Sequence, residues 1–320
     1  MVRHRVLAGA VVLLEVVLPA THAGARPPLV LSSRAELGVV AVGGGPARTL
    51  RLGRFVFLSR PSFSSSGASI LFGAQRCFRC APVVIRVSAR GGTVQTILRK
   101  ASQPDWAPDS RRIAFVRALG PGARRGIVIF VADAGGRHVR KIRIKASEKD
   151  ERHESAPILG NPVFSPDGAT LVFEQEVEPA EAHQLFVVDL KTGDTRQLTA
   201  GRRGATQAAF SRDGQTLAFA CEQKDGTLDI CVSDRDGRHR RNLVRARGND
   251  AHPVFSPDGR TIVFDSDRAA RRYGFRSLYA VDSDGGRLRR LTRGFDASEP
   301  DVAPDGRRII FIRRAIVNPQ

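Results

Sequence analysis

Aromatic residues are scarce in this sequence, and long apolar runs are almost absent. Phe, Trp and Tyr together make up 6% of the 320 residues, with a single Trp and two Tyr. Proteins that bind nucleic acid specifically tend to gather basic side chains on one element and to interleave them with aromatic ones. Here the arginines are spread over turns and strand ends throughout the chain, so we expect no specific nucleic-acid partner.

Only the N-terminus has an apolar run of note. Arg3 and Arg5 precede the apolar residues Val6 to Leu18, and Ala23-Gly-Ala25 offers small residues for cleavage. The run is shorter than the roughly 20 apolar residues that a membrane-spanning helix needs. The pattern predicts a secretory signal over residues 1–25, with a retained anchor as the alternative. We expect a mature chain, residues 26–320, that has no transmembrane segment and is secreted or works in the periplasm or cell envelope.

Cysteine is also rare, and its spacing suggests local pairing. Cys77 lies close to Cys80, and Cys221 lies close to Cys231. An even number of cysteines in an exported protein favours disulfides. A Cys-x-x-Cys redox site or a four-Cys zinc site is the alternative, but no thioredoxin-like βαβ pattern surrounds Cys77, and the second spacing is not that of a zinc site. We therefore expect one structural disulfide in each pair.

Positive charge, in contrast, is abundant. The chain has 51 Lys and Arg against 32 Asp and Glu, a formal net charge of +19, and only six of the basic residues are Lys. A charge of this size attracts anionic polymers or phosphate headgroups. The alternative is that the whole sequence is simply rich in arginine. The 42% hydrophobic and 26% charged composition is that of a globular protein with a sizeable core.

One short phrase is repeated six times along the chain, each time before an alternating apolar run. The copies are Phe63-Ser-Ser-Ser-Gly67, Trp106-Ala-Pro-Asp-Ser110, Phe164-Ser-Pro-Asp-Gly168, Phe210-Ser-Arg-Asp-Gly214, Phe255-Ser-Pro-Asp-Gly259 and Val302-Ala-Pro-Asp-Gly306. Pro and Asp favour a tight turn, and Gly takes its left-handed position, so each copy predicts strand, turn, strand. The phrases recur every 43 to 47 residues, with one gap of 58, which is the period of four-stranded propeller blades rather than of a sandwich.

The two ends of the chain complete one blade between them. After the last phrase only the strand Arg308 to Arg313 remains, which is half a blade. Leu37 to Val42 and Arg48 to Leu52 match the third and fourth strands of the other copies. We predict an all-β, six-bladed propeller whose ring is closed by pairing of N- and C-terminal strands, leaving only short edges. The strand Leu29 to Ser32 has no assigned place.

These repeats resemble a known family. Phe255-Ser-Pro-Asp-Gly259, Phe264-Asp-Ser-Asp-Arg268, Leu278-Tyr-Ala-Val-Asp282 and Arg290-Leu-Thr292 are similar to the WD-repeat-like propeller of the TolB family. The resemblance covers nearly the whole mature chain, but not the separate N-terminal domain that TolB carries. It implies an extracytoplasmic protein-interaction scaffold, for which the partner of TolB, Pal, suggests a Pal-like envelope protein.

A ring of polar residues is expected at the mouth of the central channel. The turns after the first and third strands of a blade share one face, here called the turn face. The connections after the second and fourth strands share the other, the loop face. Counting three residues back from each repeated anchor gives six polar residues, here called the ring residues: Arg60, Gln103, Asn161, Gln207, His252 and Glu299. They form a candidate binding funnel on the loop face, unless they are polar only because a channel mouth is wet.

The long gap between phrases implies an insertion on the loop face. Ala146 to Glu154, within an insertion at about 145–160, is charged and lacks apolar periodicity. Such a loop is either functional or a solvated, mobile segment. The loops Glu174 to His183 and Asp265 to Tyr273 open on the same side, so a partner is expected there.

Catalysis is not expected. The repeats do not match the Asp box of sialidases, the chain contains no Gly-x-Ser-x-Gly elbow, and no nucleophile, base and orienting group can be assembled. Oligogalacturonate lyases have a similar propeller with several His ligands for a metal, but His252 is the only His of the ring. We predict no catalytic residues, metal or cofactor, and a monomeric scaffold that binds a protein partner. The alternatives are a metal-dependent, carbohydrate-active lyase and an electrostatic binder of anionic cell-wall polymers.

Overall fold

The computed structural model describes residues 30–31, 35–50, 52–119, 126–144, 159–177, 182–270, 275–314 and 316–317. The predicted signal and the charged insertion Ala146 to Glu154 lie outside the described residues. All the regular structure in the described part is β, and no helix there is long and apolar enough to cross a membrane.

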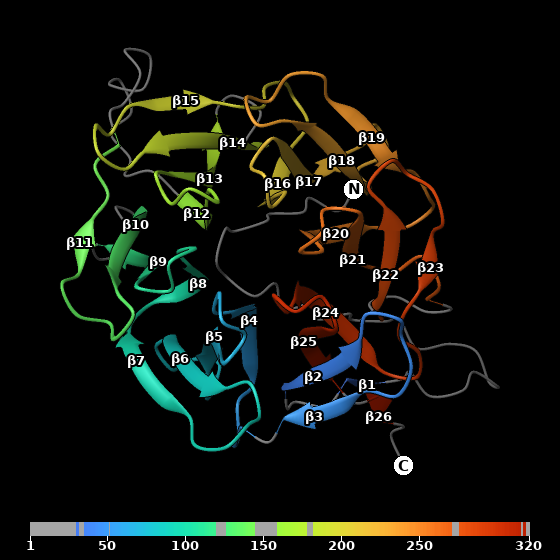
Figure 1. Cartoon of the computed structure of the whole chain (residues 1–320), viewed down its shortest axis with the longest axis horizontal. Helices are drawn as coiled ribbons and strands as arrows, with labels where there is room; N and C mark the ends of the chain where they lie inside the picture. The colour runs from blue at the N-terminus through green and yellow to red at the C-terminus, as the bar shows by residue number, and fades with distance from the viewer. Residues whose placement is uncertain are drawn as a thin grey trace, which may run out of the picture.

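The chain forms six antiparallel four-stranded sheets arranged around a central axis, as predicted (Figure 1). Blade 1 consists of β4 (Phe57–Phe63), β5 (Ser69–Gln75), β6 (Val83–Ser88) and β7 (Gln95–Arg99). Blade 2 consists of β8 (Ser102–Trp106), β9 (Arg112–Leu119), β10 (Gly126–Asp133) and β11 (Arg140–Lys141). Blade 3 consists of β12 (Leu159–Phe164), β13 (Thr170–Val177), β14 (Ala182–Asp189) and β15 (Thr195–Gln197). Blade 4 consists of β16 (Ala205–Phe210), β17 (Thr216–Glu222), β18 (Leu228–Asp234) and β19 (Arg241–Val244).

Blade 5 follows the same order, and blade 6 closes the ring. Blade 5 consists of β20 (Asp250–Phe255), β21 (Thr261–Ser266), β22 (Ser277–Asp282) and β23 (Arg289–Arg290). Blade 6 has the order β24 (Asp296–Val302), β25 (Arg308–Arg314), β2 (Glu36–Ala41) and β3 (Arg48–Leu50). Leu37 is paired with Ile312 and Val39 with Ile310, so the N-terminal strand completes the C-terminal blade. This confirms the predicted closure.

The unplaced N-terminal strand pairs with the C-terminus. β1 (Val30–Leu31) and β26 (Ile316–Val317) form a separate antiparallel pair, in which Val30 faces Val317. The two ends of the chain are therefore joined a second time, outside the blades.

The second strand of each blade forms the centre of the core. Its middle residue is Phe in all six blades, and each of these side chains is 0% exposed: Phe72, Phe115, Phe173, Phe219, Phe264 and Phe311. Because both faces of a central strand are covered by neighbouring blades, these strands are apolar at consecutive positions rather than alternating strictly. The repeated aromatic residue therefore fixes the spacing between blades.

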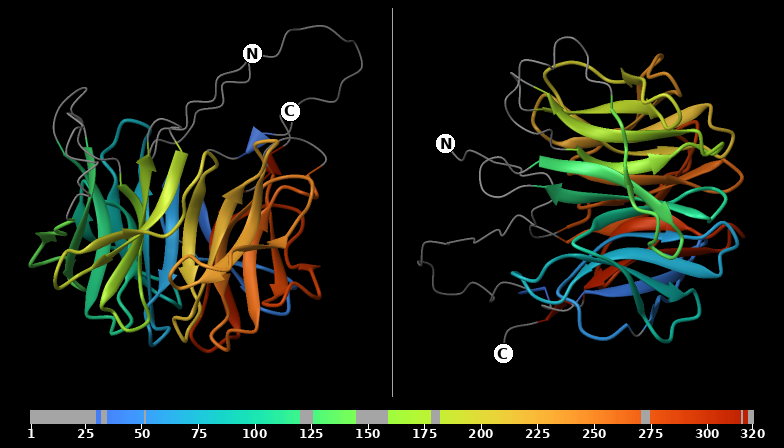
Figure 2. Two further views of the ribbon diagram at one scale, coloured as in Figure 1. Left: turned by 90° about the horizontal axis from the view of Figure 1, so that it is seen from above. Right: turned by 90° about the vertical axis from the view of Figure 1, so that its left-hand side faces the viewer.

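The repeated phrase forms the expected turn. In blade 5, Gly259 has φ +71° and its N–H donates to the carbonyl of Ser256 at 2.9 Å. The Ser256 hydroxyl donates to Oδ1 of Asp258 at 2.6 Å, and the same oxygen accepts the N–H of Arg260 at 3.1 Å. These bonds explain why Ser, Asp and Gly recur together. In the left view of Figure 2 the tight turns lie along the lower side of the disc.

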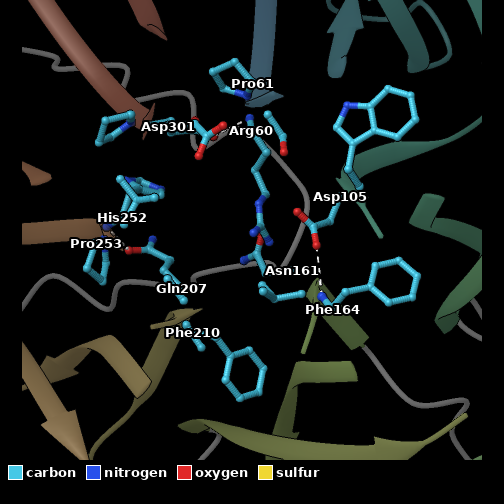
Figure 3. A pocket seen from close by; sticks show the side chains of 18 of the residues that line it. Arg60, Pro61, Asp105, Asn161, Phe164, Gln207, Phe210, His252, Pro253 and Asp301 are labelled. Carbon is cyan, nitrogen blue, oxygen red and sulfur yellow. Dashed lines mark hydrogen bonds between the residues drawn. The ribbon is translucent and has the colours of Figure 1, made fainter. Parts of the chain in front are cut away.

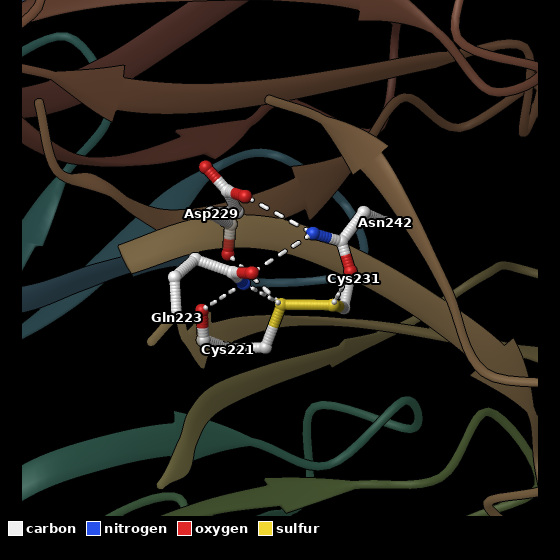
Figure 4. Close-up of a disulfide and its surroundings, with 5 residues drawn as sticks. All are labelled: Cys221, Gln223, Asp229, Cys231 and Asn242. Carbon is white, nitrogen blue, oxygen red and sulfur yellow. Dashed lines mark hydrogen bonds between the residues drawn. A yellow bond between two sulfur atoms is a disulfide. The ribbon is translucent and has the colours of Figure 1, made fainter. Parts of the chain in front are cut away.

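Both disulfides join cysteines that are neighbours in the sequence. Cys221 and Cys231 link the paired strands β17 and β18, and both side chains are 0% exposed (Figure 4). Asn242 and Gln223 lie beside this bridge and are bonded to each other. Cys77 and Cys80 instead close a small exposed loop between β5 and β6. One bridge therefore belongs to the core and the other to the loop face.

Candidate functional site

Each ring residue lies at a bulge in the first strand of its blade. Their φ angles are all positive, between 44° and 57°. At each of them the pairing with the second strand shifts register. The next residue is Pro in five blades and Ala208 in blade 4. A left-handed φ costs a residue other than Gly about 1 to 2 kcal/mol, so contacts around the bulges must offset this strain.

Hydrogen bonds across the blade boundaries supply such contacts in five blades. In blades 1, 3 and 5 the N–H at the bulge donates to a ring side chain of the preceding blade. The bonds are Arg60 N to Glu299 Oε2 at 2.7 Å, Asn161 N to Gln103 Oε1 at 2.9 Å, and His252 N to Gln207 Oε1 at 3.0 Å. Ring side chains therefore join neighbouring blades.

In blades 4 and 6 the acceptor comes from the second strand of the preceding blade. The N–H of Gln207 donates to Oε1 of Glu174 at 2.6 Å, and the N–H of Glu299 donates to Oδ2 of Asp265 at 2.8 Å. Each carboxylate is held by a ring residue of its own blade: Asn161 Nδ2 donates to Glu174 Oε1 at 2.8 Å, and His252 Nδ1 lies 2.8 Å from Asp265 Oδ2. The ring thus alternates between side chains with donor groups (Arg60, Asn161, His252) and side chains that accept (Gln103, Gln207, Glu299).

Blade 1 has no carboxylate on its second strand. Gly73 occupies the position of Glu174 and Asp265, directly after the buried Phe, and a side chain there would collide with the hydroxyl of Ser59. Arg60 therefore has no carboxylate partner in its own blade. Its Nη1 donates to Oδ1 of Asn161 at 3.4 Å, and it forms no ion pair with any described residue. Figure 3 shows its side chain extending through the middle of the pocket toward Asn161.

A cavity of about 260 Å³ occupies the channel. Five ring residues line it, and Gln103 does not. The lining continues along the first strands to Pro166, Ser211 and Arg212, which begin turns of the opposite face. The ring residues thus lie in a cavity that extends toward the turn face, whereas the sequence suggested only a mouth on the loop face.

Two carboxyl groups in the channel wall, those of Asp105 and Asp301, have strongly raised pKa values. Asp105 Oδ2 accepts the N–H of Phe164 at 2.9 Å, and Asp301 Oδ2 accepts the N–H of Phe63 at 2.7 Å, so each joins its blade to the next. Enclosure raises the pKa of Asp105 to about 6, against the opposing charge of Arg60. Enclosure, together with the charge of Asp105, raises the pKa of Asp301 to about 7. When protonated, each group can donate a hydrogen bond, and Asp301, with the higher pKa, keeps its proton closer to neutral pH.

His252 is tied to a buried ionic group. Asp265 is 0% exposed and forms ion pairs with both His252 and Arg276. Burial opposes ionisation of Asp265, but the charges of Arg276 and His252 hold its pKa below the usual range. Burial likewise opposes the charge on His252, but the carboxylates of Asp265 and Glu299 raise its pKa. The imidazole is thus oriented through Nδ1, and 28% of its side chain stays exposed.

The described residues show no donor set for a metal. His138 lies within hydrogen-bond distance of Asp133, and His239 of Asp234, each in a hairpin of the turn face. These hairpins join the third and fourth strands, whereas the ring residues lie in the first strands. Within the described ranges no three His, Cys, Asp or Glu residues form a group that could hold a metal ion.

Counting back from the anchors identified residues that share one structural position, but it missed four carboxylates beside them. Asp105 and Asp301 directly precede the anchors Trp106 and Val302. Glu174 and Asp265 directly follow the central Phe of their second strands, where the other blades have apolar residues or Gly. A charged residue at a position that the repeat keeps apolar was therefore the available signal.

Six four-stranded blades around a polar channel define a β-propeller with a cavity on its axis. The chain belongs to the family of the TolB beta propeller domain, whose model matches residues 153–318. It is 34% identical over 178 residues to the Tol-Pal system protein TolB of Bordetella pertussis, covering 55% of this chain and 36% of that protein. It is 28% identical over 210 residues to an uncharacterized protein of Agrobacterium fabrum, covering 65% of this chain and 64% of the relative. The chain thus spans less than two thirds of the length of these relatives.

Solved structures agree on the fold. The putative TolB from Agrobacterium tumefaciens superimposes with a TM-score of 0.73 at 18% identity, covering 90% of this chain and 100% of that one. An oligogalacturonate lyase in complex with manganese gives a TM-score of 0.53 at 15% identity, covering 92% of this chain and 97% of that one. At these identities the likeness concerns the fold alone.

Proposed function

We propose that the protein is a non-catalytic, extracytoplasmic scaffold that binds a protein partner through its central channel. The observation that carries this proposal is the unpaired guanidinium of Arg60 in the cavity. A cavity of about 260 Å³ is small for a drug-sized ligand, but it fits a side chain or a chain terminus of a partner. Arg60 presents a fork of donors, and the carboxyl of Asp301, whose pKa burial raises to about 7, offers a further polar contact.

The kind of partner follows from the family. The relative in Bordetella pertussis is named as a protein of the Tol-Pal system. With the predicted secretory signal, this supports a Pal-like envelope protein as the partner and a location in the periplasm or cell envelope.

The lyase alternative has less support. A metal-dependent lyase of this fold needs several protein ligands around its ion. Within the described ranges no three His, Cys, Asp or Glu residues form a group that could hold an ion, and His252 is the only histidine among the ring residues. We therefore do not extend the chemistry of the lyase to this chain.

The test is capture of envelope proteins at high salt by three forms of the protein. Arg60→Gln removes the guanidinium in the channel and leaves its N–H bond to Glu299, whereas Arg90→Gln removes one exposed charge from the turn face. We expect a partner that binds wild type and Arg90→Gln equally and binds Arg60→Gln about tenfold more weakly, as the loss of one charged hydrogen-bonded contact predicts. Calorimetry with the purified partner measures the difference. Equal binding to all three forms would contradict a binding site in the channel. The absence of any salt-resistant partner would contradict the scaffold role.

A further inference from the structure

The two faces of the propeller differ strongly in charge. The described connections of the loop face contain thirteen Lys or Arg and two Asp. Those of the turn face contain eleven Lys or Arg and eight Asp. All eight Asp belong to the repeated phrases or to the hairpins between third and fourth strands, and seven of them accept a backbone N–H of their turn. Within the described connections, positive charge is thus largely offset on the turn face and hardly offset on the loop face.

Most of the basic residues in the described loop-face connections form no ion pair with another described residue. Arg268 is paired with Asp250 and Arg276 with Asp265, both acids lying in strands. Without these two arginines, eleven basic residues and two acidic ones remain in the described connections. The basic residues come from every part of the ring: Arg54, Arg76, Arg79, Lys100, Arg143, Arg202, Arg203, Lys224, Arg245, Arg247 and Arg293. A broad basic face of this kind attracts an extended anionic surface.

An apolar side chain projects from the same face. Phe78 is 60% exposed, the largest exposed fraction among the large hydrophobic side chains of the described residues. It lies between Cys77 and Cys80, whose disulfide closes the loop, and its ring packs edge-on against Phe57 at 5.0 Å. The neighbouring Arg76 and Arg79 are exposed. A constrained loop therefore presents one aromatic ring between two cations.

We propose that the loop face docks on an anionic lipid surface, with Phe78 inserted at the headgroup level and the arginines against the phosphates. A soluble polyanion would interact with the arginines but would make no favourable contact with the exposed ring of Phe78. A lipid interface accommodates both, because basic residues gain near anionic headgroups and aromatic rings partition into the interface. This proposal goes beyond partner binding in the channel. The two are compatible, since the cavity extends to residues that begin turns on the other face.

The experiment is flotation with lipid vesicles, using protein from a host that exports it. Vesicles contain equal parts of phosphatidylglycerol and phosphatidylcholine, or phosphatidylcholine alone. Two quadruple variants remove equal charge from exposed arginines that form no ion pair among the described residues. The loop-face variant carries Arg202→Gln, Arg203→Gln, Arg245→Gln and Arg247→Gln, and the turn-face variant carries Arg90→Gln, Arg137→Gln, Arg260→Gln and Arg307→Gln. Phe78→Ala tests the ring, with Leu288→Ala as its control because Leu288 is 45% exposed on the turn face.

We expect binding to the anionic vesicles only. The loop-face variant should bind at least about tenfold more weakly, since each of the four arginines near the surface contributes about 1 kcal/mol and 1.4 kcal/mol is a factor of ten. The turn-face variant should stay within about twofold of wild type, because its charges lie beyond a Debye length from the lipid. Phe78→Ala should lose about tenfold from the apolar contact, and Leu288→Ala should lose nothing. In Phe78→Trp, vesicles should shift the fluorescence to the blue against the constant background of Trp106, which is 8% exposed.

Each contrary result overturns the proposal in its own way. Equal loss in the two quadruple variants would mean attraction by net charge without a preferred face. Loss in the loop-face variant alone, with Phe78→Ala unchanged and no blue shift, would assign the face to an anionic polymer or an acidic protein instead of a lipid. Thermal melting of every variant separates these results from unfolding, since all the substituted side chains are exposed.

Discussion

His252 and Asp265 face each other across the first two strands of blade 5, with 2.8 Å between Nδ1 and Oδ2. The same Oδ2 accepts the N–H of Glu299 from blade 6 at 2.8 Å, so one carboxylate orients a channel side chain and holds a blade boundary. Asn161, Glu174 and Gln207 repeat this arrangement between blades 3 and 4. The polar ring is therefore part of what holds the propeller together as well as the wall of its cavity.

Replacing Asp265 by Asn should lower both the pKa of His252 and the stability of the fold. The carboxylate is buried between two cations, and removing one partner of such a pair costs about 3 to 5 kcal/mol. The pKa of Asp265 is lower in the folded state than in the unfolded state. Its contribution to the free energy of unfolding is therefore present above the pKa of the unfolded state and is lost as the pH falls through the pKa of the folded state. NMR titration of the His252 ring should show a lower pKa in the variant. An unchanged His252 titration would mean that Asp265 does not hold its charge.

Asp301 should make the protein less stable as pH rises through neutrality. Its native pKa is raised from 3.8 to about 7, so the folded state binds more protons than the unfolded state between these values. The contribution of Asp301 to the free energy of unfolding is therefore fully present below pH 3.8 and is lost as the pH rises toward about 7. Asp301→Asn keeps an oxygen for the N–H of Phe63 and should raise stability at pH 8 by about 2 kcal/mol, given about 1.4 kcal/mol per pKa unit and coupling to Asp105. Denaturant unfolding at pH 5 and pH 8 measures this, and equal gains at both values would contradict it.

Glu174 should matter far more than its neighbour Glu176. Glu174 is 6% exposed and accepts bonds from Asn161 and from the N–H of Gln207, whereas Glu176, two residues along the same strand, is only partly buried. Glu174→Ala leaves a strained bulge without its acceptor and should cost about 2 to 3 kcal/mol. Glu176→Ala should change stability by less than about 0.5 kcal/mol. Similar melting temperatures for the two variants would show that bonds across blade boundaries contribute little.

The two disulfides should differ in accessibility and in their effect on stability. Cys221 and Cys231 are 0% exposed and are ten residues apart, while Cys77 and Cys80 are three apart in an exposed loop. A larger closed loop restricts the unfolded chain more, so replacing Cys221 and Cys231 by Ala should cost about 3 kcal/mol and replacing the other pair by Ser about 2 kcal/mol or less. Mild reduction followed by alkylation and mass spectrometry should label Cys77 and Cys80 first. Simultaneous labelling of all four would mean that the buried bridge opens as easily as the exposed one.

Much of the fold could be predicted because its determinants are local. The phrase from Phe255 to Gly259 specifies its own turn through Ser256, Asp258 and a left-handed Gly. The beginnings of the first strands are harder to recognise: β20 starts at Asp250, well before the phrase that begins at Phe255. The reason is the bulge at His252, which depends on an acceptor from the neighbouring blade and is marked locally only by the Pro that follows it.

By itself the sequence determined the number of blades, the turns and the closure of the ring, because these depend on a repeated phrase and on the half blade at each end. Only the tertiary structure decided which side chains meet in the channel. It placed Glu174 and Asp265 under the bulges of the following blades and left Arg60 beside Gly73 without a carboxylate. It also exposed Phe78 on the face whose described connections contain few acidic residues. These relationships join residues of different blades, and a repeat of about 45 residues cannot encode them until the ring brings the blades side by side.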